Sequence, residues 1–407
     1  MNSLAIRTIQ THERTPLVLW AAIGFIFVTI GRVQEIIPGL EKLYLGKVFG
    51  ILMIVAFLFY SGGKNKIKFK DSPELLCILG IIILALWSIP FSMWPGGSVD
   101  FLSNFLIKNL AFCYILTLTL TTLNHLRKMI FALLGATVLL SLIALASHTD
   151  VSRISAGVTY DPNDLALLLL CVLPFAAFGF IEEKGIKKIL LLLAVGLIIV
   201  SIIFTISRAG FVGLIAVGGI ILIKTFRKKK VMAISFLIAC AAIFVFLAPS
   251  EYWERMSTMT NPEEDYNVTS YAGRIEVWKR GIKLIMEHPF TGVGIGEFAV
   301  AEGESHKEIG GKWSAAHNSF IQIGAELGVG GLFFFILLIF YSLRRIRKLS
   351  FKDPKLLIYR DSVGVSLVGY LVGSFFLSQA YSPILYLLVA MATALTCIVK
   401  KSDLANA

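Results

Sequence analysis

Long runs of apolar residues follow one another along most of this chain, with short polar segments between them. A hydrocarbon core about 30 Å thick is crossed by a helix of roughly 20 residues, so each run is predicted to cross a membrane. The runs that we identify are 17–31, 45–61, 75–93, 101–121, 129–147, 164–181, 188–206, 209–226, 231–249, 320–343, 356–378 and 381–399. The predicted fold class is therefore all-α, a polytopic integral membrane protein with about twelve transmembrane helices.

The basic residues between the runs predict how the chain is oriented in the membrane. Alternate loops together hold 24 Lys and Arg residues, whereas the opposite loops hold 12, of which seven lie in the single long loop 250–316. Cytoplasmic loops carry the excess of Lys and Arg, so both termini are predicted to be cytoplasmic. The long loop is then predicted to face the periplasm, and with eleven acidic residues it is net acidic.

The same pattern predicts four segments along the chain. Residues 1–249 form an N-terminal transmembrane bundle of about nine helices, and 250–316 form the periplasmic loop. Residues 317–399 form about three C-terminal transmembrane helices, and 400–407 form a cytoplasmic tail. Short helices are expected within the loop.

One such helix is predicted from Gly273 to Met286, because apolar residues recur there at helical spacing. The stripe consists of Ile275, Trp278, Ile282 and Ile285. Apolar residues three and four apart lie on one face of a helix. This helix either lies on the membrane surface with its basic residues toward lipid phosphates or packs on the ends of other helices.

Composition excludes a soluble fold. Hydrophobic residues make up 57% of the chain and charged residues 16%, against about 45–50% and about 25% in ordinary globular proteins. The net charge of +12 does not indicate nucleic acid, because the basic residues are dispersed between apolar runs instead of gathered on one soluble face. The five cysteines are scattered singly within the runs, which indicates neither a zinc site nor a disulfide framework.

Arg208 is the most conspicuous candidate for chemistry. It stands in Thr205-Ile206-Ser207-Arg208-Ala209-Gly210, a predicted outward turn so tight that the helices on either side are almost continuous. The planar guanidinium suits paired phosphate oxygens better than the point charge of lysine does. The alternative is an interfacial arginine that reaches toward lipid headgroups.

Arg274 and His317 are the other candidates. Arg274 stands at the start of the predicted amphipathic helix, where an ordinary solvated arginine is the alternative. His317 stands where the long loop re-enters the membrane. Histidine is the usual general base because its unperturbed pKa lies nearest to physiological pH, although a lone histidine at a helix start is also commonly structural.

Two further features favour simpler interpretations. Lys108, four residues past Asn104, is interpreted as a lysine that extends to the membrane interface. Gly292-Val293-Gly294-Ile295-Gly296 lacks the preceding strand that a dinucleotide fingerprint requires. The chain contains no HExxH, DxD or GxSxG sequence, so a metalloprotease, a divalent-dependent sugar-nucleotide transferase and a serine hydrolase all lack their usual groups.

Several short segments together resemble the superfamily of O-antigen ligases and O-antigen polymerases, bacterial membrane glycosyltransferases. The resemblance extends from about residue 155 to about 345, and it depends on the order and spacing of motifs that are weak individually. These motifs are Tyr160-Asp161-Pro162-Asn163-Asp164, Ser207-Arg208-Ala209-Gly210, Gly273-Arg274 with Trp278, Pro289 to Gly296, and His317-Asn318-Ser319-Phe320 with Glu326-Leu327-Gly328.

The resemblance implies a GT-C-like membrane fold and a metal-independent, inverting transferase without a cofactor in the bacterial inner membrane. Its donor would be a glycan on undecaprenyl diphosphate, and its acceptor a hydroxyl of lipid A–core or of another glycan. Arg208 and Arg274 would bind the diphosphate, and His317 would be the general base. Membrane lipid is the expected surrounding, and nucleic acid is not an expected partner.

Three alternatives to a ligase stay open at this point. A polymerase that joins carrier-linked repeat units uses similar chemistry, and so does transfer to serine or threonine of a protein. A flippase or transporter for lipid-linked glycans also suits about twelve helices, although transporters commonly show internal repeats and polar sites at the membrane midplane.

Overall fold

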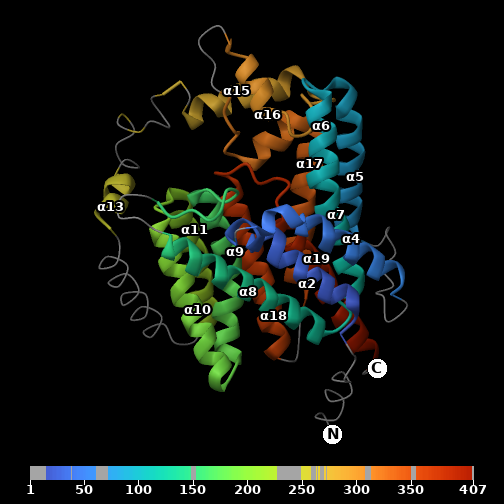
Figure 1. The fold of residues 1–407 in the computed structure, drawn as a ribbon, viewed down its shortest axis with the longest axis vertical. Coiled ribbons are helices and arrows are strands. Elements are labelled where there is room, and N and C mark those ends of the chain that lie inside the picture. Colours follow the sequence, from blue (N-terminus) through green and yellow to red (C-terminus); the bar gives the residue numbers. More distant parts are fainter. Residues whose placement is uncertain are drawn as a thin grey trace.

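The computed structural model describes residues 15–37, 39–60, 72–147, 153–226, 249–257, 263, 265, 270–271, 273–307, 313–349 and 354–405. These residues form helices, joined by loops that include one isolated β-bridge between Ala156 and Tyr160 (Figure 1). Eight helical segments are long and apolar enough to cross a membrane. The protein is therefore a multi-pass membrane protein, as its sequence predicts.

The eight long segments comprise the following helices. They are α5 (Pro73–Ser88) with the short turn Ile89–Phe91, α6 (Pro95–Phe101) continuing through Leu102–Leu106 into α7 (Ile107–Thr119), α8 (Leu123–Ala146), α9 (Pro162–Glu182), α10 (Gly185–Phe204), α11 (Arg208–Thr225), α17 (Ser319–Lys348) and α18 (Pro354–Ser374). The N-terminal region also contains the shorter helices α2 (Leu17–Thr29), α3 (Val33–Ile36) and α4 (Leu45–Leu58), and α19 (Pro383–Ala405) forms the C-terminal end.

Eleven of the twelve predicted windows coincide with helices. The twelfth, 231–249, lies outside the described residues except for Pro249, so the number twelve stays a prediction. At the C-terminal end, α19 continues as a helix to Ala405, through most of the segment that we expected to be a tail.

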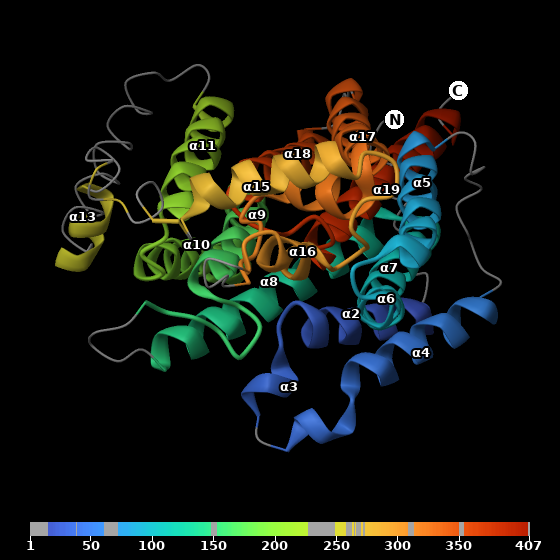
Figure 2. The same cartoon turned by 90° about the horizontal axis from the view of Figure 1, so that it is seen from above.

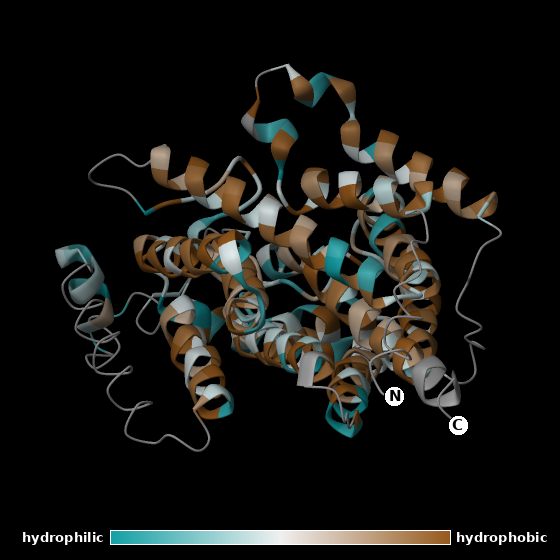
Figure 3. Ribbon diagram, turned by 90° about the horizontal axis from the view of Figure 1, so that it is seen from below, coloured by the Kyte–Doolittle hydropathy of each residue, from teal (hydrophilic) through white to brown (hydrophobic). Residues whose placement is uncertain are grey.

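The centre of the bundle is formed by α9 and α19. Almost every side chain from Leu165 to Ala176 and from Ile384 to Leu395 is buried, and a helix that is apolar all round is expected to lie inside a protein. α9 packs against α18, α10 and α11, whereas α19 packs against α7 and α18. Apolar residues predominate along the helices (Figure 3).

Buried hydroxyl groups within the bundle donate to backbone carbonyls of their own helices. Thr117, Thr119, Ser342, Thr393 and Thr396 each donate to the carbonyl four residues earlier. In a hydrocarbon environment no water satisfies such groups, so a partner within the same helix keeps these polar residues compatible with the membrane.

A smaller helical layer covers one end of the bundle. It contains α15 (Arg274–Glu287) and α16 (Phe298–Glu304), and Figure 2 shows α15 lying across the bundle between α11 and α17. The predicted helix in the long loop is thus confirmed, and it ends at His288 as expected.

The packing face of α15 differs from the predicted stripe. Ile275 and Ile282 are exposed, whereas Val277, Gly281 and Leu284 are buried against α16 and α17. A Cβ at position 281 would lie 2.4 Å from Ile321. A glycine at the contact lets α15 approach α17 closely, and a hydrophobicity pattern does not register that contribution.

The glycine-rich segment from Gly292 to Gly296 packs against α17 where that helix is broken. Gly328 leaves the helical region, with φ 69° and ψ −172°, and frees backbone groups around it. Val293 and Gly294 donate to the carbonyls of Ala325 and Glu326, and Val329 donates to the carbonyl of Pro289. The glycines therefore serve close backbone packing.

Gly292→Ala is expected to destabilise the protein strongly. Gly292 has φ +64°, and a Cβ there would lie 2.1 Å from the carbonyl oxygen of Glu326. The matched control is Gly185→Ala, since Gly185 has φ +58° and no described atom within 4 Å of a Cβ. The control should be destabilised only by the cost of an alanine in the left-handed region, about 1 kcal/mol. Thermal unfolding in detergent should show a clearly larger fall in Tm for Gly292→Ala, and equal falls would contradict this role.

Candidate functional site

Arg208 stands at the first position of α11, directly after the tight turn that the sequence predicts. α10 ends at Phe204, and Ser207 caps α11 by accepting a hydrogen bond from the backbone of Gly210. Ile206 between them adopts a left-handed conformation with φ 49°. This conformation is strained for a β-branched residue, and such strain persists where the surrounding structure fixes it, often at functional sites.

The guanidinium of Arg208 forms a two-point contact with a carboxylate. Nη1 donates to Asp265 Oδ2 over 2.6 Å, and Nη2 donates to Oδ1 over 3.1 Å. Both side chains are largely buried. Phosphate oxygens accept from a guanidinium in the same paired manner, and binding of a phosphate by Arg208 stays a prediction.

Arg153 ties this turn to the start of α9. Its Nε donates to the carbonyl of Thr205 over 2.7 Å, and its Nη2 donates to Asn163 Oδ1 over 2.9 Å. The same amide oxygen accepts from the hydroxyl of Ser207. Asp161 caps α9, accepting from the backbone of Asn163 and Asp164. The Tyr160–Asp164 segment therefore lies beside the turn that carries Arg208.

Arg274 and Arg255 complete a cluster of four arginines with Arg153 and Arg208. Burial lowers the pKa of Arg274, and the charges of Arg208 and Arg255 lower it further. Burial lowers the pKa of Arg153 to about 10, with Arg255 the largest of the charges that add to this effect. Arg255, on α13 (Ser250–Ser257), likewise has a lowered pKa, from burial and then from Arg208.

Asp161 and Asp265 are the carboxylates that oppose this cluster among the described residues. Asp161 raises the pKa values of Arg153 and Arg274, and Asp265 raises those of Arg255 and Arg274. Four partly buried guanidinium groups therefore lie close to these two carboxylates. Guanidinium groups form charge-assisted, paired hydrogen bonds with phosphate oxygens as they do with carboxylates, so the arrangement is suited to binding an anion.

His317 borders the same cluster at the start of α17. Its backbone N–H donates to Ser378 Oγ over 2.8 Å, and its φ of 48° is left-handed. Burial lowers the pKa of His317 to about 4, with the charge of Arg274 lowering it further and Asp161 opposing them. The imidazole is thus neutral near pH 7 and able to accept a proton.

Hydrogen bonds fix the backbone around His317. Trp278 of α15 donates from Nε1 to the carbonyl of Ala316 over 3.0 Å, and Asn318 caps α17. Gln379 donates from Nε2 to Asp164 Oδ1 and from its backbone to Ser319 Oγ. The loop between α18 and α19 therefore joins the start of α17 to the start of α9.

The structure thus brings the three predicted residues into one electrostatic neighbourhood, from the starts of three different helices. The sequence reasoning missed Arg153, Arg255, Asp161 and Asp265 as members of the cluster. The available signal was that all four lie in segments predicted to face outward. Polar loops contain many solvated charges, so this signal alone does not single them out.

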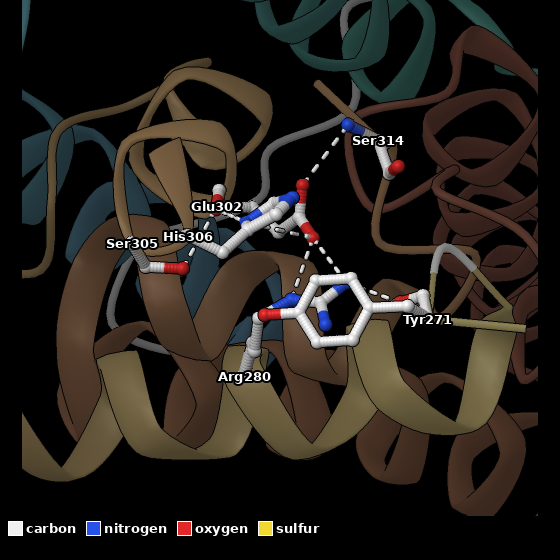
Figure 4. A network of polar contacts seen from close by, with 6 residues as sticks. All are labelled: Tyr271, Arg280, Glu302, Ser305, His306 and Ser314. Atoms are coloured by element: carbon white, nitrogen blue, oxygen red, sulfur yellow. Dashed lines mark hydrogen bonds and ion pairs between the residues drawn. The ribbon is translucent and has the colours of Figure 1, made fainter. Parts of the chain in front are cut away.

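A second polar network lies beneath α15 and is structural. Arg280 donates from Nε to Glu302 over 2.8 Å and stacks on the ring of Tyr271. Glu302 is fully buried and also accepts from the backbone of Ser314, and His306 contacts the carbonyl of Glu302 (Figure 4). This network joins α15 to α16 and to the segment that leads to His317. Arg280 therefore does not face lipid phosphates.

Among the described residues, no group of three or more His, Cys, Asp or Glu side chains is arranged to hold a metal ion. The donors gathered at the candidate site are mainly guanidinium groups, which bind anions and not metals.

The fold and the site together define a multi-pass membrane protein with an arginine and histidine cluster at helix ends. Residues 165–336 match the model of a family described as O-antigen ligase, and this range includes Arg208, Arg274 and His317. The resemblance to the O-antigen ligase superfamily is thereby confirmed.

Three curated relatives agree with that match. A Rickettsia conorii protein named "Putative polysaccharide ligase" is 28% identical over 257 residues, which span 60% of this chain and 60% of the relative. A similarly named protein from Rickettsia typhi is 26% identical over 368 residues, or 86% of each chain. A third, from Rickettsia felis, is 26% identical over 57% of this chain and 58% of its own length.

Proposed function

We propose that the protein is a polysaccharide ligase-like glycosyltransferase that moves a glycan from undecaprenyl diphosphate to an acceptor hydroxyl at the periplasmic face of the inner membrane. The observation that carries the proposal is the convergence of Arg208, Arg274 and neutral His317, with Arg153 and Arg255 adding to the positive charge. The family match and the names of the relatives support the same class of reaction.

In this proposal the arginines bind the diphosphate of the donor. Negative charge develops on the diphosphate as the sugar–phosphate bond breaks, and prearranged cations stabilise that charge in the transition state. Arg208 offers two N–H groups in one plane, as its contact with Asp265 demonstrates. The donor phosphate would replace that carboxylate.

His317 accepts the proton of the attacking hydroxyl in the same scheme. The hydroxyl oxygen forms a bond to the anomeric carbon on the side opposite the diphosphate, the bond to the diphosphate oxygen breaks, and the configuration inverts. General-base catalysis of this kind contributes roughly 10²–10⁴-fold. The polyprenyl tail stays in lipid while the head reaches the cluster at the helix ends.

Transfer by the purified protein tests the function. The protein in lipid nanodiscs would be incubated with a radiolabelled glycan on undecaprenyl diphosphate, with EDTA and with candidate acceptors. The proposal expects label in a new glycosidic linkage and release of undecaprenyl diphosphate. If reconstituted vesicles only move the labelled donor across the bilayer, the protein is a transporter and the proposal is wrong.

The pH dependence of transfer should reflect the lowered pKa of His317. Imidazole acts as a base only when unprotonated, so kcat/KM, which reports the free enzyme, should fall only as pH decreases toward about 4. Bound diphosphate adds negative charge near His317 and raises its pKa, so the acid limb of kcat should lie at higher pH. Pre-steady-state and steady-state rates from pH 3 to 9 measure the acid limbs of kcat/KM and of kcat, and coincident limbs near pH 6.5 would contradict this environment of His317.

A further inference from the structure

We propose that a separate cavity between α2, α4 and α7 binds the phosphate of an anionic phospholipid headgroup. The cavity has a volume of about 240 Å³. Its cationic lining consists of Arg32, Lys47 and Lys108, and these residues are distinct from those of the arginine and histidine cluster. Lys108, which sequence alone assigns to the membrane interface, faces a binding site in this proposal.

The lining combines cations with amide and hydroxyl groups and with apolar residues. The neutral polar groups come from Thr29, Gln34, Asn104 and Asn109, and the apolar walls from Phe25, Val28, Phe105 and Pro383. Like charges on Lys47 and Lys108 repel across a shared cavity. An anion between them converts that repulsion into attraction, so the lining favours phosphate.

Buried polar atoms at the cavity are left without partners among the described residues. They are Nε of Arg32 and Oε1 of Gln34. Arg32 pairs through Nη1 with Glu35 over 3.1 Å and also contacts Tyr160, so Nε is the atom of its guanidinium that a ligand could satisfy. Most buried polar groups in proteins have a hydrogen-bond partner, and a headgroup supplies phosphate oxygens for Arg32 and glycerol hydroxyls for Gln34.

Backbone strain marks the same place. In the described part of the chain, the non-glycine residues with left-handed φ are Arg32, Tyr44, Ile206 and His317. Ile206 and His317 border the arginine and histidine cluster, whereas Arg32 and Tyr44 line the cavity. Strained residues gather at functional sites and ligand clamps, so the second pair independently indicates a site.

The surface beside the cavity fits the tails of a lipid. Leu43, Tyr44 and Val48 are exposed apolar residues next to it, and Ile51, Val55 and Leu58 continue the exposed apolar face along α4. α4 lies at the rim of the molecule beside α2 (Figure 2). Acyl chains along α4 would place the headgroup phosphate at the basic lining.

The cavity is also joined to the start of α9. The guanidinium of Arg32 stacks over the ring of Tyr160, 5.8 Å from its centre, and Glu35 accepts from the backbone of Val158 and Thr159. A lipid that orders Arg32 therefore also supports the turn that precedes Asp161. The binding proposal itself is independent of the transfer reaction.

Native mass spectrometry of the full-length protein tests the proposal, with phosphatidylglycerol, phosphatidylcholine and inorganic phosphate as probes. Wild type should retain one phosphatidylglycerol in preference to phosphatidylcholine. Lys108→Gln and, separately, Lys47→Gln should weaken its binding about tenfold, the effect of losing one charged hydrogen bond. Lys108→Arg, which keeps the charge, should stay within about threefold of wild type.

The matched control is Lys42→Gln, because Lys42 is an exposed lysine nearby that does not line the cavity. It should bind phosphatidylglycerol like wild type, and Lys47 is exposed enough for its variant to fold. The proposal is wrong if the two lipids bind alike, or if Lys42→Gln weakens binding as much as Lys47→Gln. If inorganic phosphate binds as well as phosphatidylglycerol does when phosphatidylcholine is present, the proposed lipid ligand is wrong and the cavity is a phosphate site.

Discussion

Arg208→Lys is expected to lose most transfer activity, about 10²–10³-fold in kcat, although the charge is kept. A lysine is a point charge and does not offer two coplanar N–H groups to paired oxygens. Removal of one prearranged transition-state donor costs rates of this order in other enzymes. In the resting structure Arg208 donates both groups to Asp265, and this paired geometry is what the substitution removes.

The control for this substitution is Arg347→Lys. Arg347 is exposed near the end of α17 opposite His317, on the far side of the break at Gly328. Both variants should fold, because the substituted ammonium group still neutralises Asp265 in Arg208→Lys, and thermal unfolding checks this. Near-normal transfer by Arg208→Lys would count strongly against paired binding of the diphosphate.

His317→Ala is expected to lose most transfer activity while binding of the carrier diphosphate persists. Burial lowers the pKa of the imidazole to about 4, so His317 is neutral near pH 7, and the substitution leaves the arginines that we propose to bind phosphate untouched. The loss should be about 10²–10⁴-fold, the usual contribution of a general base. Transfer rates and equilibrium binding of undecaprenyl diphosphate measure the two effects separately.

A second variant separates the chemistry of His317 from its backbone role. Position 317 has φ 48°, which alanine tolerates poorly and asparagine tolerates well. His317→Asn should therefore fold and bind like wild type yet stay inactive, because an amide is not a base. If His317→Asn transfers glycan normally, the imidazole is not the base, and if binding and folding fail together, His317 is structural.

The helical membrane fold was predictable because its signal is repeated and local. Each run from 75–93 to 209–226 contains enough apolar residues to predict a membrane-spanning helix without help from the rest of the chain, and the structure has helices there. The packing of α15 was not predictable to the same degree. Gly281 contributes by being small, so the buried face differs from the most apolar one.

The candidate site was predictable only where a residue is conspicuous in its own segment. Arg208 at a tight turn and His317 at a helix start have that property, whereas Arg153 and Arg255 lie in ordinary polar segments. The charges of Arg153 and Arg274 act on each other across more than a hundred residues of sequence. Only the fold brings the loop before α9, which carries Arg153, close enough to the start of α15 for these two charges to interact.

The paired contact with Asp265 also lies beyond sequence reasoning. Asp265 is one of eleven acidic residues in the segment 250–316, and nothing nearby in sequence distinguishes it. Its carboxylate meets Arg208 from 57 residues away. The structure therefore adds a resting-state partner of Arg208, which the donor would displace in the proposed mechanism.

Cryo-electron microscopy of the protein with undecaprenyl diphosphate bound tests the central claim most directly. The account predicts both phosphates among Arg208, Arg274 and their neighbouring arginines, with the carboxylate of Asp265 displaced and the imidazole of His317 beside the position of the sugar. Density for the diphosphate at another part of the bundle, with Arg208 still paired to Asp265, would contradict the account.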